Sequence, residues 1–74
     1  DYLSNQENQI ILNELEKMKK QDKDIFILYY YEGRKVKEIA IMNEISESKI
    51  KSKLFRIRKR LKKILKEGGY DFNE

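Results

Sequence analysis

Residues 46–66 read SESKIKSKLFRIRKRLKKILK, and the other segments are interpreted in relation to them. Apolar residues recur here at steps of four and three, which predicts one amphipathic helix over residues 47–66. The expected buried positions are Ile50, Leu54, Ile57, Leu61 and Ile64. Ser46 is the expected N-cap, because its hydroxyl can accept a hydrogen bond from a backbone N–H of the first turn. Gly68 and Gly69 are expected to end the helix, since glycine adopts a left-handed conformation at low cost.

The opposite face of this helix is polar and basic. It carries Ser48, Lys51, Ser52, Arg56, Lys59, Lys62 and Lys63. Phe55 is the exception, because at about 100° per residue it projects about 140° from Ile50 and falls among the basic side chains. Two interpretations stay open: another helix covers the ring, or the ring meets a thymine methyl group in a DNA groove.

Charge is distributed unevenly along the chain. Residues 1–48 hold seven basic and ten acidic side chains, whereas residues 49–66 hold ten basic side chains and no acidic one. Residues 67–74 add three acids. The formal net charge of +4 therefore conceals a concentrated basic helix, which is the electrostatic pattern of a protein that binds a polyanion.

Composition limits the classes of function. A chain of 74 residues makes one small domain, and it contains neither cysteine nor histidine. Disulfides, thiolate metal sites and a histidine base are excluded, so no metal, cofactor or enzymatic activity is expected. No apolar run approaches the roughly 20 residues that cross a bilayer. The chain begins at Asp1 without a visible signal peptide, which suggests a piece of an intracellular, cytoplasmic protein.

The segments before residue 46 predict three shorter helices. The first is expected over residues 5–20, the second ends at about Tyr31, and the third covers residues 36–42. Gly33 is expected to be left-handed in the turn after the second helix. We expect one domain over the whole chain, with a core and two tails. Their expected limits are 8–66 for the core, and 1–6 and 68–74 for the tails.

The third helix and the long basic helix are separated by Asn43, Glu44 and Ile45. Two helices joined by three or four residues, with the second longer and basic, indicate a helix-turn-helix. The predicted fold class is an all-α, four-helix domain with a C-terminal helix-turn-helix and a long basic recognition helix. Lys35 and Lys37, near the start of the third helix, are placed to meet phosphates.

The pattern also predicts how two further groups of side chains pack. The tyrosines at 29–31 cannot all share one helix face, so we expect core packing with the phenol groups at the rim. Ile41 and Met42 are also expected to pack in the core, with contact to a partner as the alternative.

Three blocks of sequence resemble region 4 of the sigma-70 family, and most closely that of the extracytoplasmic-function group of bacterial sigma factors. The blocks are IFILYYYEG at 25–33, KEIA at 37–40 and ISESKIKSKLFRIRKRL at 45–61. The resemblance covers about residues 8–66, and the order and spacing of the blocks make it specific.

This resemblance implies a function in transcription initiation. In that family the second helix of the motif enters the major groove of the minus-35 promoter element. The domain also docks on the flap of the RNA polymerase β subunit, and anti-sigma factors often mask it. The implied partners are therefore double-stranded promoter DNA, the RNA polymerase core and an anti-sigma factor, without a membrane. The matching DNA-facing positions are Lys51, Ser52, Phe55 and Arg56, with Lys49 and Lys53 beside them.

The residues themselves add three further contacts to DNA. The free N–H groups at the Ser46 end of the long helix can receive a phosphate. The hydroxyl of Ser48 can bond to a base or to a phosphate. Residues 58–66 lie too far along a straight helix to stay in the same groove, and Lys59 is the best placed of them for a phosphate.

The chain departs from the family pattern at its turns. Met18-Lys19 stands where the family usually has Leu-Pro, and Lys35 replaces the Ser or Thr that opens the third helix. Asn43-Glu44 replaces a frequent Leu-Gly pair. It stays open whether Asn43 or Glu44 becomes left-handed, at a cost of about 1 kcal/mol for a residue with a Cβ.

Other functions compete with this one. A LuxR-type helix-turn-helix domain of a response regulator shares the Lys-Glu-Ile-Ala block and a four-helix layout. A sigma-like interaction module bound by an anti-sigma factor would need no DNA contact. Binding of the basic helix to anionic lipid is disfavoured, because its apolar face is needed for the core.

Overall fold

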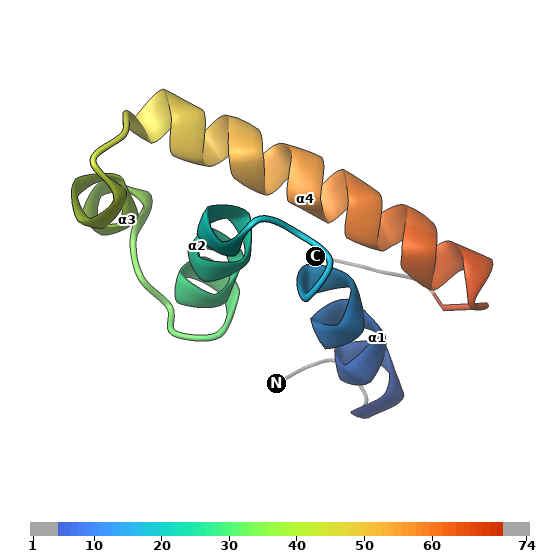
Figure 1. Cartoon of the computed structure of the whole chain (residues 1–74). Coiled ribbons are helices and arrows are strands. Elements are labelled where there is room, and N and C mark those ends of the chain that lie inside the picture. The colour runs from blue at the N-terminus through green and yellow to red at the C-terminus, as the bar shows by residue number, and fades with distance from the viewer. Residues whose placement is uncertain (1–4, 71–74) are drawn as a thin grey trace.

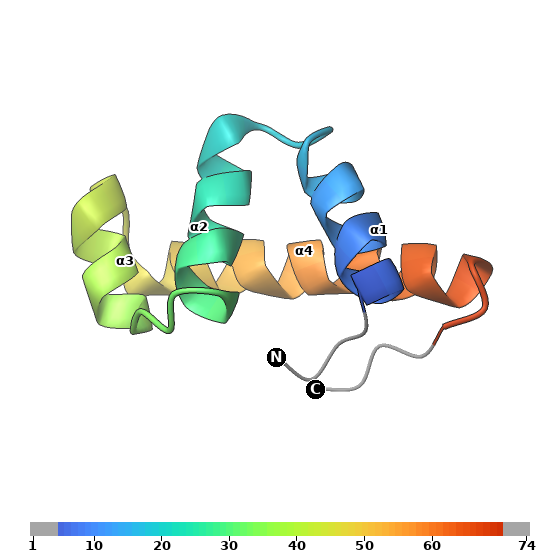
Figure 2. The same cartoon turned by 90° about the horizontal axis from the view of Figure 1, so that it is seen from below.

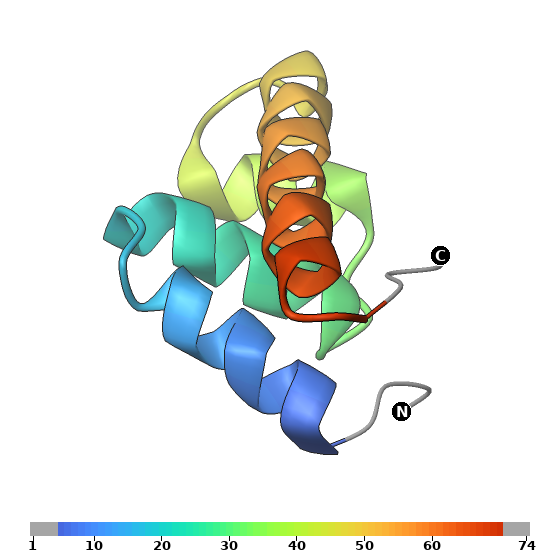
Figure 3. The ribbon, with the colours of Figure 1, turned by 90° about the vertical axis from the view of Figure 1, so that its right-hand side faces the viewer.

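The computed structural model describes residues 5–70, and within that range it consists of four helices without a strand. These are α1 (Asn5–Leu15), α2 (Lys20–Tyr30), α3 (Val36–Asn43) and α4 (Glu47–Glu67). The helix α4 runs along one side of the molecule, and the other three lie next to one another against it (Figure 1). The same order is seen from below and along α4 (Figures 2 and 3). The predicted all-α fold is confirmed.

The apolar face of α4 is the centre of the core, because α4 contacts α1, α2 and α3 in turn. Its predicted residues Ile50, Leu54, Ile57 and Leu61 are all buried. At the far end Leu65 is fully buried, whereas the expected Ile64 is only half-buried. The reason is that an apolar repeat of 3.5 residues drifts around a helix of 3.6 residues per turn by about 20° per heptad.

The prediction that the first helix extends to Lys20 is wrong. The helix α1 ends at Leu15, and a short connection leads into α2 at Lys20. Lys19 has an extended backbone, with φ −60° and ψ 147°. This break lets Leu15 and Ile25, both fully buried, reach the core from two separate helices. The mostly polar residues 16–19 could continue a helix, but the burial of Leu15 and Ile25 in one core requires the chain to change direction between them.

The end of α2 agrees with the prediction of a helix that reaches about Tyr31. Tyr29 and Tyr30 are half-buried, and the ring of Tyr30 stacks on the buried Phe26 with centroids 4.5 Å apart. Tyr31 is 42% exposed, and its hydroxyl donates a hydrogen bond to Asn8 Oδ1 of α1 at 2.8 Å. The tyrosine run thus packs at the rim of the core, as expected.

The turn between α3 and α4 settles which residue is left-handed. Glu44 has φ 56° and ψ 40°, while Asn43 ends α3 and its side-chain amide donates to the Ile39 carbonyl at 2.9 Å. The backbone N–H of Ile45 donates to the Ala40 carbonyl at 3.2 Å, which closes the helix end. A residue with a Cβ therefore occupies a position that favours glycine.

Both predicted ends of α4 are confirmed. Ser46 Oγ accepts a hydrogen bond from the Lys49 backbone N–H at 3.1 Å. At the other end Gly69 has φ 89°, and Tyr70 N–H donates to the Leu65 carbonyl at 2.8 Å. This is the hydrogen-bond pattern of a glycine-terminated helix. Gly33 has φ 69°, as predicted for the turn after α2.

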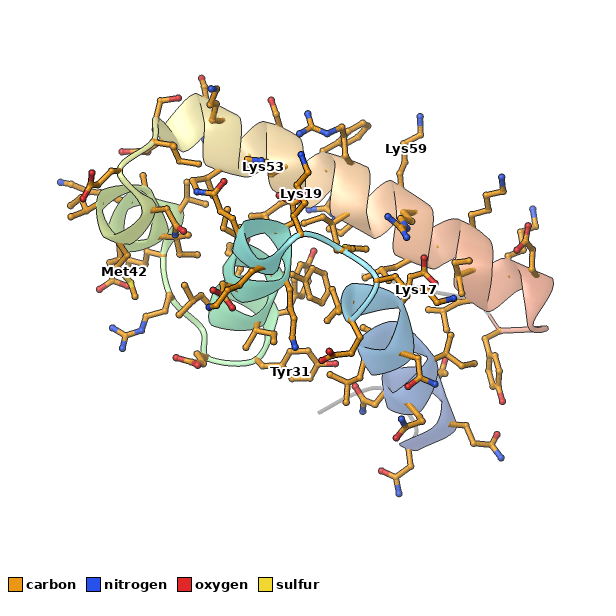
Figure 4. The ribbon with its side chains drawn as sticks, in the orientation of Figure 1. Lys17, Lys19, Tyr31, Met42, Lys53 and Lys59 are labelled. Carbon is orange, nitrogen blue, oxygen red and sulfur yellow. The ribbon has the colours of Figure 1, made fainter. Side chains whose placement is uncertain are left out.

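The expectation that Ile41 and Met42 pack in the core is wrong. Ile41 is 71% exposed and Met42 is 55% exposed. Ile39 and Ala40 supply the buried face of α3, so residues one and two positions later must point outward on a helix. Met42 lies on the side of α3 away from α4 (Figure 4).

Candidate nucleic-acid interface

The outward face of α4 presents the predicted DNA-facing side chains. Ile50, Leu54 and Ile57 hold the opposite face in the core, so the rotation of the helix is fixed. The side chains that this leaves exposed are Ser48, Lys49, Lys51, Ser52, Phe55, Arg56 and Lys59. These residues therefore form one accessible surface over the first three to four turns of the helix.

Phe55 is the most informative residue of this surface. Its side chain is 57% exposed, so no helix within residues 5–70 covers it. Lys59, one turn later, places its Nζ 5.7 Å from the centre of the ring. This contact leaves the ring accessible between two basic turns of α4. A large apolar side chain on a basic surface is suited to an apolar group on a polyanion, such as the methyl group of thymine.

The start of α4 is a second part of the candidate interface. Ser46 is exposed, and its oxygen already accepts from Lys49 N–H, so the cap fixes the direction of the first turn. Glu47 lies in that turn and adds one negative charge where the helix dipole favours it. The other backbone N–H groups of this first turn are not bonded to the cap, and they point toward the N-terminal end of α4, where Ser48 also lies.

Lys35 and Lys37 are exposed at the start of α3. The Lys35 side chain has no oxygen with which to cap a helix, as the sequence indicated. Instead, the Glu38 carboxylate accepts a hydrogen bond from the Lys35 backbone N–H at 3.0 Å. Because the side chains of both lysines are exposed, they can meet a phosphate from α3 rather than from α4.

Lys53 is the predicted site residue that the structure places differently. It is half-buried on the flank of α4, and its Nζ bonds to Asp22 Oδ1 of α2 at 3.0 Å. Its charge is therefore balanced within the protein. Lys53 joins α2 to α4 and sits beside the exposed face rather than on it.

Sequence reasoning missed a group of cations beside Arg56. Lys17 and Lys19, from the connection between α1 and α2, lie in one groove with Arg56 and Arg60 of α4. Figure 4 shows Lys17 and Lys19 reaching toward α4 from below. Only the lysine-rich sequence at 17–20 could have signalled this group, and it gave no indication of which helix it would meet.

Residues 5–70 were also compared with the requirements of a metal site and of a membrane-spanning helix. In that range no three acidic side chains are arranged to hold a metal ion. None of the four described helices combines the length and apolar character of a membrane span. The Glu14 carboxyl has a pKa below its ordinary value, because the Arg60 side chain donates a hydrogen bond to it.

A comparison with family models matches the chain to Sigma-70, region 4, over residues 8–61. The chain belongs to this family. Sigma-70 region 4 is a family of DNA-binding transcription domains rather than of enzymes, and its members interact with DNA and RNA polymerase. The matched residues include all of α2 and α3 and the first turns of α4. Comparisons with curated proteins and with solved structures found no match.

Family membership identifies the helix-turn-helix that carries the candidate interface. In this region 4 domain, α3 and α4 are the two helices of the helix-turn-helix, and Glu44 to Ser46 form the turn. The match favours the sigma-factor interpretation of the Lys37–Ala40 block over the LuxR-type one.

Proposed function

We propose that the chain is the minus-35-binding domain of a sigma factor of the extracytoplasmic-function type. It would direct RNA polymerase to promoters in the bacterial cytoplasm by inserting the start of α4 into the DNA major groove. The main support is the exposed Phe55, held outward among lysines and arginines by a fully buried opposite face.

The dimensions of the interface suit this insertion. Residues 47–56 span about 15 Å along α4, while the major groove is about 12 Å wide. The first turns can therefore contact bases while the rest of the helix leaves the groove. Residues 58–66 then act at longer range, because their positive charge raises the rate and strength of association with DNA.

Each exposed side chain of the first turns has a suitable DNA partner. Arg56 and Lys51 can donate to guanine or to a phosphate, and the hydroxyl of Ser52 can bond either. Phe55 offers the apolar contact that a thymine methyl group requires. Lys35 and Lys59 would contact phosphates on either side of the base-reading turns. In this arrangement the base contacts of α4 would determine the sequence preference, and the phosphate contacts of Lys35 and Lys59 would orient the domain on the DNA.

The proposed function also includes binding to RNA polymerase. The domain would be delivered to the promoter by docking on the flap of the RNA polymerase β subunit. That tether raises its effective concentration at the promoter, so an affinity of only about micromolar for DNA in isolation would suffice.

The experiment that tests this function is a selection from randomised duplexes with the 74-residue chain, followed by titration of fluorescence anisotropy. We expect an enriched motif that contains thymine, and binding at least about tenfold weaker to a scrambled duplex. Affinity should fall steeply between about 50 mM and 200 mM salt, because bound phosphates release counterions. Selection without an enriched motif, or binding without salt dependence, would refute the proposal.

A second function is favoured by one observation. Ile41 and Met42 are consecutive exposed apolar residues of α3. Met42 lies on the side of α3 away from α4 (Figure 4). An anti-sigma factor could hold the domain through them. Replacing both with serine should then leave DNA affinity unchanged and weaken such a complex. Equal binding of the variant and the unsubstituted chain to the anti-sigma factor would exclude this surface.

A further inference from the structure

A groove of about 390 Å³ lies between the α1–α2 connection and one flank of α4. Its lining is unusually basic. It consists of Lys17, Met18, Lys19, Asp22, Lys53, Arg56, Ile57 and Arg60. Five of these eight residues carry a positive charge and one carries a negative charge. Lys17 and Lys19 approach from the connection, and Lys53 from α4 (Figure 4).

The ion pairs in and beside the groove do not neutralise it. Asp22 balances Lys53 at 3.0 Å. Glu14, which lies behind the groove, bonds to Arg60 at 2.7 Å, and its second oxygen is 3.5 Å from Lys17. Two carboxylates thus face five cations.

Lys19 and Arg56 carry the unbalanced charge. Neither has an ion-pair partner among residues 5–70. Both line the groove and are exposed, and they come from segments that are distant in sequence. Two exposed cations that line one groove, neither of them paired with a carboxylate, favour an anion from outside the chain.

Arg56 connects this groove to the DNA-facing surface. At about 100° per residue, Arg60 and Lys53 lie about 40° and 60° around α4 from Arg56, away from Phe55. The groove is therefore on the flank of the helix that enters the DNA. A helix in a major groove has one phosphate backbone on each side, so a backbone must pass close to this flank.

We propose that the groove binds phosphate of the DNA strand that borders α4, with Lys19 and Arg56 as the principal contacts and Lys17 as a secondary one. This inference rests on the proposed DNA-binding function and adds a sequence-independent contact from the α1–α2 connection. Such a contact would fix the angle at which α4 enters the groove, because it holds the DNA at a point about one helix diameter from the bases that α4 reads.

The test begins with the variants Lys19→Gln and Lys17→Gln/Lys19→Gln in the 74-residue chain. Both side chains are exposed, so circular dichroism should show an unchanged fold. On the selected duplex we expect the double variant to bind about five- to tenfold more weakly. The slope of log affinity against log salt should fall by about 1 to 2. The charge-matched control is Lys63→Gln/Lys66→Gln, at the far end of α4, which should change affinity less than about threefold.

A phosphate scan then identifies the contact. Single methylphosphonates, which remove one phosphate charge, are placed along the duplex outside the selected bases. The unsubstituted chain and the control should lose affinity at one or two neighbouring positions, and the double variant, which keeps Arg56, should lose clearly less affinity there. Equal sensitivity of the double variant and the control at every position overturns the inference, while the DNA-binding function stands. Absence of binding by the unsubstituted chain overturns the proposed function and this inference with it.

Discussion

Glu14 of α1 and Arg60 of α4, 46 positions apart in the sequence, form the ion pair that joins the first helix to the last. Arg60 Nε donates to Glu14 Oε2 at 2.7 Å, and the Glu14 side chain is only 8% exposed. The hydrogen bond from Arg60 holds the pKa of the Glu14 carboxyl below its ordinary value, although burial acts in the opposite direction. An acid buried at this place needs its partner, because an unpaired buried charge is strongly destabilising.

The first prediction concerns the stability that this pair supplies. Glu14→Gln should lower the free energy of unfolding by about 1–2 kcal/mol near neutral pH, measured by urea denaturation. Because the pKa is lower in the folded state, the carboxylate stabilises the fold above its unfolded pKa. That contribution is lost as the pH falls through the folded pKa. The difference between the two proteins should therefore shrink below about pH 4.

The control for this pair is Glu16→Gln. Glu16 pairs with Lys23 at the surface, where its side chain is 67% exposed, so its loss should cost less than about 0.5 kcal/mol. Equal effects of the two substitutions, or a difference between Glu14→Gln and the unsubstituted chain that persists at acid pH, would contradict the assignment.

The second prediction separates Phe55 from the core. Phe55→Ala should change the free energy of unfolding by less than about 0.5 kcal/mol, since the ring is mostly exposed. Ile57→Ala, two residues later and buried, should cost about 2–5 kcal/mol. Urea denaturation of both variants measures this contrast. A large loss of stability in Phe55→Ala would show that the ring supports the fold.

The third prediction tests what Phe55 contacts. Replacing thymine by uracil in the selected duplex removes only a methyl group. At the base that meets the ring, this should weaken the unsubstituted chain by about three- to tenfold, roughly the value of one buried methyl group. Phe55→Ala should be indifferent to the same change, with a nearly unaltered salt slope. Equal sensitivity of both proteins to uracil at every position would refute a contact between the ring and thymine.

The fourth prediction concerns the basic residues of the first turns. Lys51→Ala and Arg56→Ala should each weaken binding to the selected duplex by about five- to thirtyfold, as expected for one lost base or phosphate contact. Loss of a phosphate contact lowers the salt slope by about 1, whereas loss of a base contact relaxes preference at one position. Lys66→Ala, at the far end of α4, is the matched control, and a response equal to that of Lys51→Ala would point to general charge alone.

The fifth prediction concerns the left-handed residue between α3 and α4. Glu44→Gly should raise the free energy of unfolding by about 0.5–1 kcal/mol, because glycine adopts φ 56° without a steric penalty. Thermal denaturation should show a higher midpoint. Lys63→Gly, at an exposed helical position of α4, should instead lower stability by about 1 kcal/mol. A loss of stability in Glu44→Gly would mean that its side chain has a structural role at the turn.

The sequence alone determined the features that depend on neighbours within a few residues. The spacing from Ile50 to Leu61 fixed which face of α4 is buried and placed Phe55 on the opposite side, whereas the structure decided that no helix within residues 5–70 covers the ring. Ser46 and Gly69 marked the ends of that helix because caps are local hydrogen-bond and backbone requirements. The blocks at 25–61 also pointed to the family that the comparison then showed.

Only the tertiary structure decided the features that join distant residues. The end of α1 at Leu15, the pairing of Lys53 with Asp22 and the exposure of Ile41 all follow from how helices pack. The groove that brings Lys19 to Arg56 has the same origin. Periodicity describes one helix at a time, whereas burial and ion pairing depend on which helix faces which. That arrangement is a property of the whole core rather than of any single segment.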